Sequence, residues 1–173
     1  MSDPNLELAS RRTIYQRIAD TPGVHFRALL DDLEYAQGTL QYQLRWLADE
    51  GLIDVSDDGK YTRYYPSTEF DEADQAVMNA LRREYSRRIL AHLLADGPLS
   101  TTELSDRIDK AQSTVSWHLS KLAEAELVTK ERDGRSVVYE VSDPDRVNYL
   151  YTIYRRSFTD KVVDRILGLW DRY

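Results

Sequence analysis

The sequence contains no cysteine among its 173 residues. This absence excludes a disulfide framework, a thiolate metal site and a cysteine nucleophile, and with them several classes of enzyme and metal sensor. Long apolar runs are also missing, since no stretch approaches the length needed to cross a bilayer. The first residues, Met1 to Asn5, have neither the basic nor the apolar region of a signal peptide. We expect a soluble, cytoplasmic protein with no membrane partner.

Residue groups that could hold a metal or carry out catalysis are not evident either. The histidines, His25, His92 and His118, are not grouped with carboxylates at ligand spacing. A core or capping role is therefore expected for them rather than a metal site. No combination of nucleophile and base, no glycine-rich phosphate loop and no pair of carboxylates can be singled out. We expect no metal, no cofactor and no enzymatic activity.

Lysine is scarce, so most of the positive charge comes from arginine. With 30 acidic against 23 basic side chains, the net charge is -7, which by itself opposes association with a polyanion. Acidic, lysine-poor and arginine-rich compositions resemble those of proteins from salt-loving archaea. In molar salt the Debye length is roughly 3 Å, so local pairing matters more than net charge. An ordinary acidic cytosolic protein is the alternative interpretation.

One apolar pattern is present twice in the chain. Residues 14–66 superpose on residues 89–141 without a gap. The matched apolar pairs include Ile14 and Ile89, Ile18 and Leu93, Leu29 and Leu104, Leu40 and Val115, Leu44 and Leu119, and Leu47 and Leu122. Such a repeat predicts two copies of one small fold. We expect one domain over residues 1–67 and a second over residues 68–143.

The second copy predicts the order helix, helix, helix and hairpin. Apolar spacing indicates a long first helix over about residues 74–94. Ser100 and Glu103 form a capping box that opens a short second helix. A third helix over residues 111–125 precedes two strands joined at Asp133-Gly134, a dipeptide suited to a tight hairpin turn.

The first copy repeats each of these steps. Helices are expected over residues 8–19, 25–33 and 36–50, followed by a hairpin over 52–65 that turns at Asp58-Gly59. Its second helix begins at His25, where the other copy has Ser100. Because histidine is the poorer N-cap, we expect this helix start to be held less tightly. The connection over residues 66–72 is too short to be a long flexible tether, so we expect the domains to touch.

Three helices followed by a hairpin form the winged helix-turn-helix arrangement, in which the third helix enters the major groove and the hairpin, or wing, lies along the backbone. The predicted fold is thus mainly α with small β wings (α+β). Ala36-Gln37-Gly38-Thr39 matches Ala111-Gln112-Ser113-Thr114. These segments resemble the recognition helices of the ArsR-like and MarR-like repressor families. The runs over residues 22–27 and 38–42 are similar to the first half of a group of archaeal regulators built from two such domains.

The resemblance covers about residues 8–142 and implies a transcription regulator that binds double-stranded DNA through the recognition helices over residues 36–50 and 111–125. One departure is Gln43, where that group often has histidine, as the second copy does at His118. We interpret this as a change in side-chain packing or a minor contact. No residue pattern in the sequence indicates a particular effector ligand.

The outward residues of the recognition helices and the wings are the candidate DNA contacts, because they can pair with bases or phosphates. In the first copy these are Gln37, Thr39, Gln41, Tyr42 and Arg45, with Lys60 and Arg63 in the wing. In the second copy they are Gln112, Ser113, Thr114, Ser116, Trp117 and Lys121, with Arg132 and Arg135 in the wing. The wing arginines could instead be solvated residues that offset nearby carboxylates.

A second function remains open, because outward aromatic residues are also frequent anchors of protein interfaces. Tyr42, Trp46 and Trp117 are such residues. The alternative function is a protein-interaction module built from tandem winged helices that do not read DNA directly.

After Asp143-Pro144-Asp145, a helix start, the pattern predicts one long helix over residues 144–173. Its apolar stripe could pack back on its own domains or pair with a second chain, and its length and aromatic content favour a homodimer. The expected dimerisation residues are Leu150, Tyr154, Phe158, Val162, Ile166 and Trp170.

Overall fold

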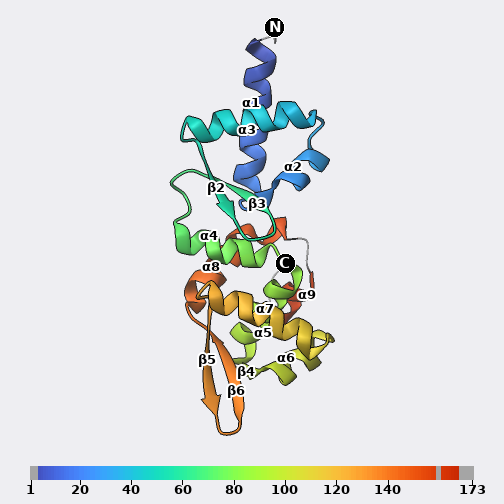
Figure 1. Ribbon diagram of the computed structural model, residues 1–173, viewed down its shortest axis with the longest axis vertical. Helices are drawn as coiled ribbons and strands as arrows, with labels where there is room; N and C mark the ends of the chain where they lie inside the picture. The colour runs from blue at the N-terminus through green and yellow to red at the C-terminus, as the bar shows by residue number, and fades with distance from the viewer. Residues whose placement is uncertain (1–3, 159–160, 168–173) are drawn as a thin grey trace. The chain divides into compact units, whose positions relative to one another are not determined.

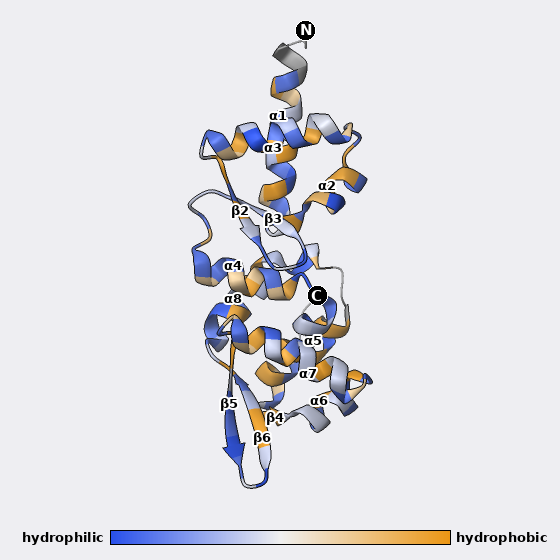
Figure 2. Cartoon of the chain, viewed as in Figure 1, coloured by the Kyte–Doolittle hydropathy of each residue, from blue (hydrophilic) through white to orange (hydrophobic). Residues whose placement is uncertain are grey.

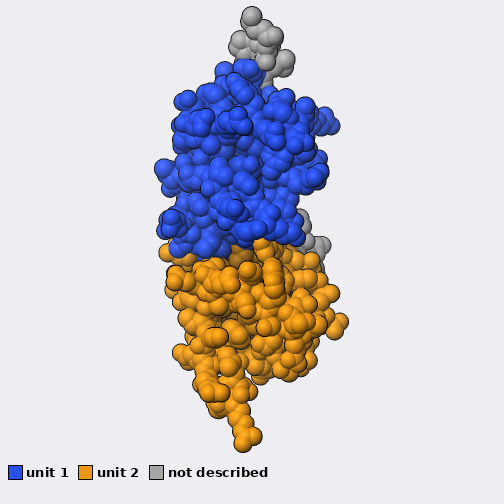
Figure 3. Space-filling model, viewed as in Figure 1, with its two compact units in different colours: residues 1–79 blue, residues 80–173 orange. Residues whose placement is uncertain are grey.

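The computed structural model describes residues 4–158 and 161–167 (Figure 1). The chain divides into two compact units, residues 1–79 and residues 80–173 (Figure 3). Within the described ranges the protein is mainly helical, and each unit contains a small antiparallel sheet, which confirms the predicted fold class. No helix in these ranges is long and apolar enough to span a membrane.

The first unit has the predicted order of helix, helix, helix and hairpin. Its elements are α1 (Pro4–Asp20), β1 (Val24–His25), α2 (Phe26–Asp32), α3 (Gln37–Asp49), β2 (Ile53–Asp57), β3 (Thr62–Pro66) and α4 (Glu72–Leu81), whose last two residues lie in the second unit. The strand β1 was not predicted, because two residues are too few for an alternating pattern. It lies on the edge of β3, where Val24 pairs with Tyr64. The sheet order is therefore β1-β3-β2.

The core of the first unit consists of apolar residues from the repeated sequence pattern. Ile14 and Ile18 of α1 and Leu29 of α2 are fully buried. The predicted inner face of α3 is also correct, since Leu40, Leu44 and Leu47 belong to the same buried cluster as the α1 and α2 residues. Burial of this stripe fixes the rotation of α3 about its axis and so decides which residues face solvent.

The second unit repeats this plan and adds the tail. Its elements are α5 (Glu84–Asp96), β4 (Leu99–Ser100), α6 (Thr101–Ile108), α7 (Gln112–Glu124), β5 (Val128–Asp133), β6 (Ser136–Val141), α8 (Pro144–Tyr154), the 3₁₀ helix η1 (Arg155–Ser157) and α9 (Lys161–Ile166). The predicted capping box is present: Ser100 accepts from the backbone N–H of Glu103, and the Glu103 carboxylate accepts from the Ser100 N–H. The sheet order β4-β6-β5 matches that of the first unit.

The single long helix predicted over residues 74–94 is wrong, because α4 and α5 are separate helices. Arg83 has an extended backbone, with φ −101° and ψ 125°. The buried guanidinium of Arg87 donates to the Leu81 carbonyl at 2.8 Å, which satisfies an acceptor that the break exposes. The apolar spacing continues across the break, so periodicity alone did not reveal it.

The tail is not one continuous helix in its described part, which corrects a second prediction. Helix α8 passes into η1, and α9 packs against α5. The rings of Tyr151 and Phe158 stack with centroids 5.3 Å apart, and the Arg82 guanidinium lies 4.6 Å from the Phe158 centroid. The tail therefore folds back on its own unit, the alternative that the sequence favoured less.

This packing changes the expected dimer contacts. Leu150 and Phe158 are buried, 4% and 5% exposed, so they are not available to a second chain. Tyr154 and Ile166 are half-buried, and Val162 is 41% exposed. Trp170 lies outside the described residues.

Candidate nucleic-acid interface

The two recognition helices, α3 and α7, begin in the same unusual way. Each follows an alanine, Ala36 or Ala111, that makes no side-chain capping hydrogen bond, and neither has an acidic residue in its first turn. By contrast, α2 and α6 are capped by the side chains of His25 and Ser100. The first backbone N–H groups of α3 and α7 are thus left for an external acceptor, at the positive end of the helix dipole. A phosphate is a suitable acceptor there.

The outward face of α3 is polar and exposed. The structure places the predicted residues together on this face: Gln37, Thr39, Gln41, Tyr42 and Arg45 are all exposed. Tyr42 is 52% exposed. Glutamine, threonine and arginine side chains of this kind can reach base edges or phosphates.

The inner flank of α3 is tied to α1 by a polar contact. Gln43 is 2% exposed and accepts a hydrogen bond from Arg11 Nε at 2.7 Å. The Arg11 guanidinium also lies 3.8 Å from the centroid of the Trp46 ring, so Trp46 is half-buried rather than an outward aromatic. The interpretation of Gln43 as a packing residue is therefore confirmed.

The same pair of positions is in contact in the second unit. Ser86 and His118 stand where the first unit has Arg11 and Gln43, and Ser86 Oγ lies 3.2 Å from His118 Nδ1. Burial, and then the positive charge of Arg83, lower the pKa of His118. His118 is thus a neutral packing group at pH 7, with its ring against the edges of Tyr85 and Trp117.

The outward face of α7 carries hydroxyls, one aromatic ring and one lysine. Gln112, Ser113, Ser116, Trp117 and Lys121 are exposed, whereas Thr114 is half-buried. Trp117 is 50% exposed, and Lys121 Nζ lies 5.7 Å from its ring centroid. Lys121 also forms an exposed ion pair with Glu124 at 3.4 Å. Such an exposed pair is weak, so the lysine can exchange this partner for a phosphate.

In the first wing, the expected exposure of Arg63 is wrong. Its side chain is 2% exposed, with Nε 2.5 Å from Asp58 Oδ2, and Nη1 donates to the Gly23 carbonyl at 2.8 Å. Burial acts to raise the pKa of Asp58, but hydrogen bonds from the Tyr61 and Lys60 backbone N–H groups and from Arg63 outweigh it and lower the pKa to about 2. Lys60 remains exposed. Arg63 therefore stabilises the turn and does not face the surface.

The second wing is longer and more open. Strands β5 and β6 project as a hairpin from the helices of their own unit (Figure 1), and Figure 2 shows the half of β5 nearer the turn as hydrophilic. The predicted residues Arg132 and Arg135 are exposed. Sequence reasoning missed Lys130, which is exposed two residues before Arg132 and so shares its strand face. That alternation was the signal that could have found it.

A metal site is not apparent in the part of the chain that the structure describes. No group of three or more His, Asp or Glu side chains in that part could hold a metal ion. The arrangement offers hydrogen-bond donors, exposed rings and cations on two helix faces, which suits contact with a macromolecule.

Two winged helix-turn-helix folds define the class of this protein, and comparison with known proteins agrees. Residues 9–78 match a family described as an N-terminal HTH domain, and residues 83–131 match a family described as a helix-turn-helix domain. The chain belongs to the helix-turn-helix family of transcriptional regulators, which confirms the resemblance.

Three relatives show how far this similarity extends. The protein named uncharacterized HTH-type transcriptional regulator MJ1398, of Methanocaldococcus jannaschii, is 30% identical over 134 residues, which are 78% of this chain and 34% of that protein. The putative arsenical resistance operon repressor ArsR of Halobacterium salinarum is 38% identical over 72 residues, 41% of this chain and 56% of the relative. The transcriptional activator HlyU of Vibrio cholerae is 32% identical over 81 residues, 45% of this chain and 74% of the relative. The chain thus spans about a third of the first relative and just over half of the second.

A solved structure of HlyU from Vibrio cholerae is also similar. It is 30% identical, covers 51% of this chain and 97% of its own chain, and superposes with a TM-score of 0.43.

Proposed function

We propose that this chain is a sequence-specific DNA-binding transcription regulator, in which α3 and α7 enter the major groove and the hairpin wings follow the backbone. The observation that carries the proposal is the surface of the second unit. There an uncapped first turn, the exposed face of α7 and a projecting strand, β5, with Lys130 and Arg132 on one face, belong to one winged helix. Family membership supports the same function. The relatives are named as transcriptional regulators or activators, so we propose no catalytic role.

The net charge of -7 is the main physical objection to this function. Local charge answers it, because Lys121, Lys130, Arg132 and Arg135 are exposed on α7 and its wing. Phosphate contacts act over a few ångströms, where salt screens distant carboxylates more than adjacent cations. The acidic remainder of the chain then limits binding to non-target DNA.

Binding of the full chain to fluorescent duplexes, selected from a random pool, tests this proposal. Anisotropy titrations at several salt concentrations should saturate, and the logarithm of the association constant should fall linearly with the logarithm of salt concentration. Arg45→Ala and Lys121→Ala should weaken binding, whereas Arg12→Ala, which removes the same charge from the exposed side of α1, should not. Absence of saturable binding at every salt concentration would refute the function.

A protein-interaction role is the second candidate, and the exposed aromatic positions favour it. Tyr42 and Trp117 occupy equivalent places in the two copies and are 52% and 50% exposed. Val55, beside α3, is 53% exposed. Large exposed side chains of this kind are common interface anchors. Failure of the duplex titration would favour this function.

We also propose that the chain forms a homodimer through the outer face of α8. Tyr149 and Ile153 are 64% and 51% exposed, and their spacing of four residues places them on one helix face. Sedimentation equilibrium of the double variant Tyr149→Ser, Ile153→Ser should then show a weakened or absent dimer. A monomeric unmodified chain would exclude this contact.

A further inference from the structure

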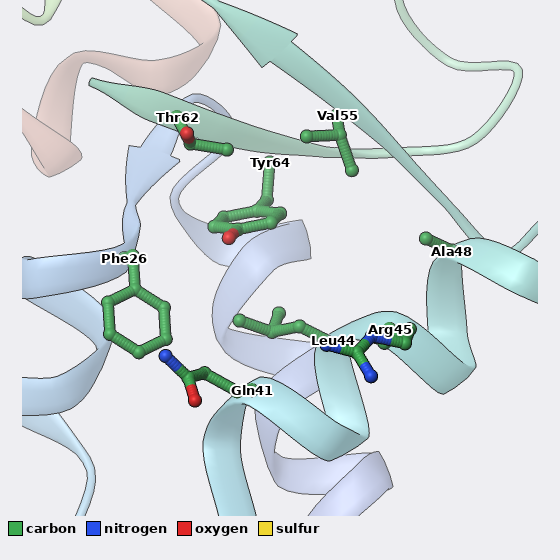
Figure 4. A pocket seen from close by; sticks show the side chains of 8 residues that line it. All are labelled: Phe26, Gln41, Leu44, Arg45, Ala48, Val55, Thr62 and Tyr64. Atoms are coloured by element: carbon green, nitrogen blue, oxygen red, sulfur yellow. The ribbon is translucent and has the colours of Figure 1, made fainter. Parts of the chain in front are cut away.

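A groove in the first unit separates α3 from the hairpin. It has a volume of about 530 Å³, within the range of roughly 300–1,000 Å³ that is usual for small-molecule sites. Figure 4 shows the residues that line it: Phe26, Gln41, Leu44, Arg45, Ala48, Val55, Thr62 and Tyr64. They come from α2, α3, β2 and β3, so four elements of one unit hold the groove in shape.

The interior of the groove is apolar. Leu44 and Tyr64 are core residues, 4% and 8% exposed, and form its floor. Figure 4 shows the Tyr64 ring between β3 and Leu44, with Phe26 at one end and Val55 toward the other. Burial raises the pKa of Tyr64, so its hydroxyl stays neutral. These surfaces suit an aromatic or branched aliphatic group and offer it no negative charge.

Two polar side chains stand at the edge of this apolar surface. Gln41 and Arg45 are four residues apart on α3, so they project from the same side of the helix. Both are exposed, and neither has a hydrogen bond, ion pair or ring contact among the described residues. Other arginines of this acidic chain, such as Arg17 and Arg146, pair with a carboxylate. The Arg45 guanidinium is therefore free to pair with a carboxylate from outside the chain.

The second copy of the fold has the framework of the groove without its distinctive groups. Leu44, Ala48 and Tyr64 correspond to Leu119, Ala123 and Tyr139, so the apolar floor is shared. The aromatic wall and the polar edge differ: Phe26, Gln41, Arg45 and Val55 correspond to Thr101, Ser116, Ser120 and Lys130. The aromatic ring and the guanidinium are thus particular to the first copy.

We propose that this groove binds a small apolar carboxylate. The apolar body of the ligand packs on Leu44, Tyr64 and Phe26. Its carboxylate accepts a bidentate pair of hydrogen bonds from Arg45, and the Gln41 amide donates another. A bound ligand covers Gln41 and Arg45 and removes both from any contact with DNA. That regulatory consequence rests on the proposed function, whereas ligand binding itself does not.

Fluorine NMR of the full chain with para-trifluoromethyl benzoate tests the site directly. We expect saturable binding with a dissociation constant of about 1 mM or tighter, as ligands of this size allow. The neutral para-trifluoromethyl benzamide should bind about tenfold more weakly, and Arg45→Met should weaken benzoate binding by about the same factor. Arg12→Met is the matched control, because it removes one exposed arginine from α1 outside the groove, and it should leave benzoate binding unchanged.

Methyl spectra locate the bound probe, with the second copy as an internal control. Benzoate should shift the methyl resonances of Ala48 and Leu44 and leave those of Ala123 and Leu119 in place. Equal shifts in both copies, or equal binding to Arg45→Met, would overturn the proposal. Equal affinity for the benzamide would also overturn it, and would indicate a purely apolar docking surface for a protein segment. If benzoate binds as expected but no duplex does, the site stands and the proposed function fails.

Discussion

The two hairpins occupy equivalent places in the repeat but are stabilised in different ways. In the first unit the Asp58 carboxylate accepts from the Lys60 and Tyr61 backbone N–H groups and pairs with the buried Arg63. In the second unit the position of Arg63 is taken by Val138, and the exposed strand β5 alternates basic and acidic side chains. One wing therefore uses its arginine to fix its own turn, while the other presents its cations to solvent.

The helices show the same division between the units. The first copy has Arg11 against Gln43 and Trp46, and the second has Ser86 against His118. Polar contacts in the first unit are thus directed inward, and Arg45 is left beside an apolar groove. This difference teaches that a duplicated fold can keep its core while the side chains on its two surfaces diverge. We expect the second unit to contribute more of the phosphate contacts and the first more of the specific recognition.

The largest expected loss of stability comes from replacing Arg63 of the first wing with valine, the residue at the equivalent position, Val138, of the second wing. Arg63→Val should destabilise the first unit by about 3 kcal/mol, because it leaves the Asp58 carboxylate buried without its guanidinium. Urea unfolding followed by Trp46 fluorescence measures this, in a background where Trp117 and Trp170 are changed to phenylalanine.

Two further variants decide whether the ion pair is the cause. The double variant Arg63→Val, Asp58→Asn should recover part of the loss, because no buried charge remains. Arg135→Val, a change of the same type on the exposed second wing, should cost the second unit less than about 0.5 kcal/mol when unfolding is followed by Trp117 in a background without Trp46 and Trp170. Equal destabilisation by Arg63→Val and Arg135→Val would show that the two wings do not differ as described.

The sequence predicted the repeat, the order of elements and the inner faces of α3 and α7, because apolar periodicity reports directly on burial. It did not predict the break at Arg83 or the return of the tail onto α5. Both depend on contacts between distant residues, such as that of Arg82 with Ser157, and both leave the apolar spacing intact. Arg63 was misplaced for a related reason: a charged residue next to a turn is usually solvated, and only the tertiary contact with Gly23 shows that this one is buried.

Removal of a helix cap should have an intermediate effect on stability, and this effect should be confined to the unit that contains the cap. Ser100→Ala removes one half of the capping box and should destabilise the second unit by about 1 kcal/mol. Thr102→Ala, an exposed change in the first turn of the same helix, is the control and should have a much smaller effect. Chemical denaturation followed by Trp117 fluorescence, with Trp46 and Trp170 replaced, measures both. No loss in the Trp117 signal, with a loss instead in the first unit when Ser100→Ala is placed in the background that keeps Trp46, would contradict the assignment of this cap to the second unit.

The smallest expected effect is a dependence on pH that belongs to the first unit. His25 caps α2 by accepting the Ala28 N–H at Nδ1, at 3.1 Å, and protonation of that nitrogen removes the acceptor. Burial, and then the Arg63 charge, lower the pKa of His25 below its usual 6.5. A lowered folded-state pKa means that this stabilisation is complete above pH 6.5 and is lost as the pH falls through the folded value.

His25→Ser, which copies the cap of the second unit, should therefore change the stability of the first unit by less than about 1 kcal/mol at pH 7.5. It should also flatten the dependence of that stability on pH below neutrality. If the stability of the His25→Ser variant depends on pH as strongly as that of the unmodified chain, the acid sensitivity comes from another group. The two helix caps would then not account for a difference in pH dependence between the two copies.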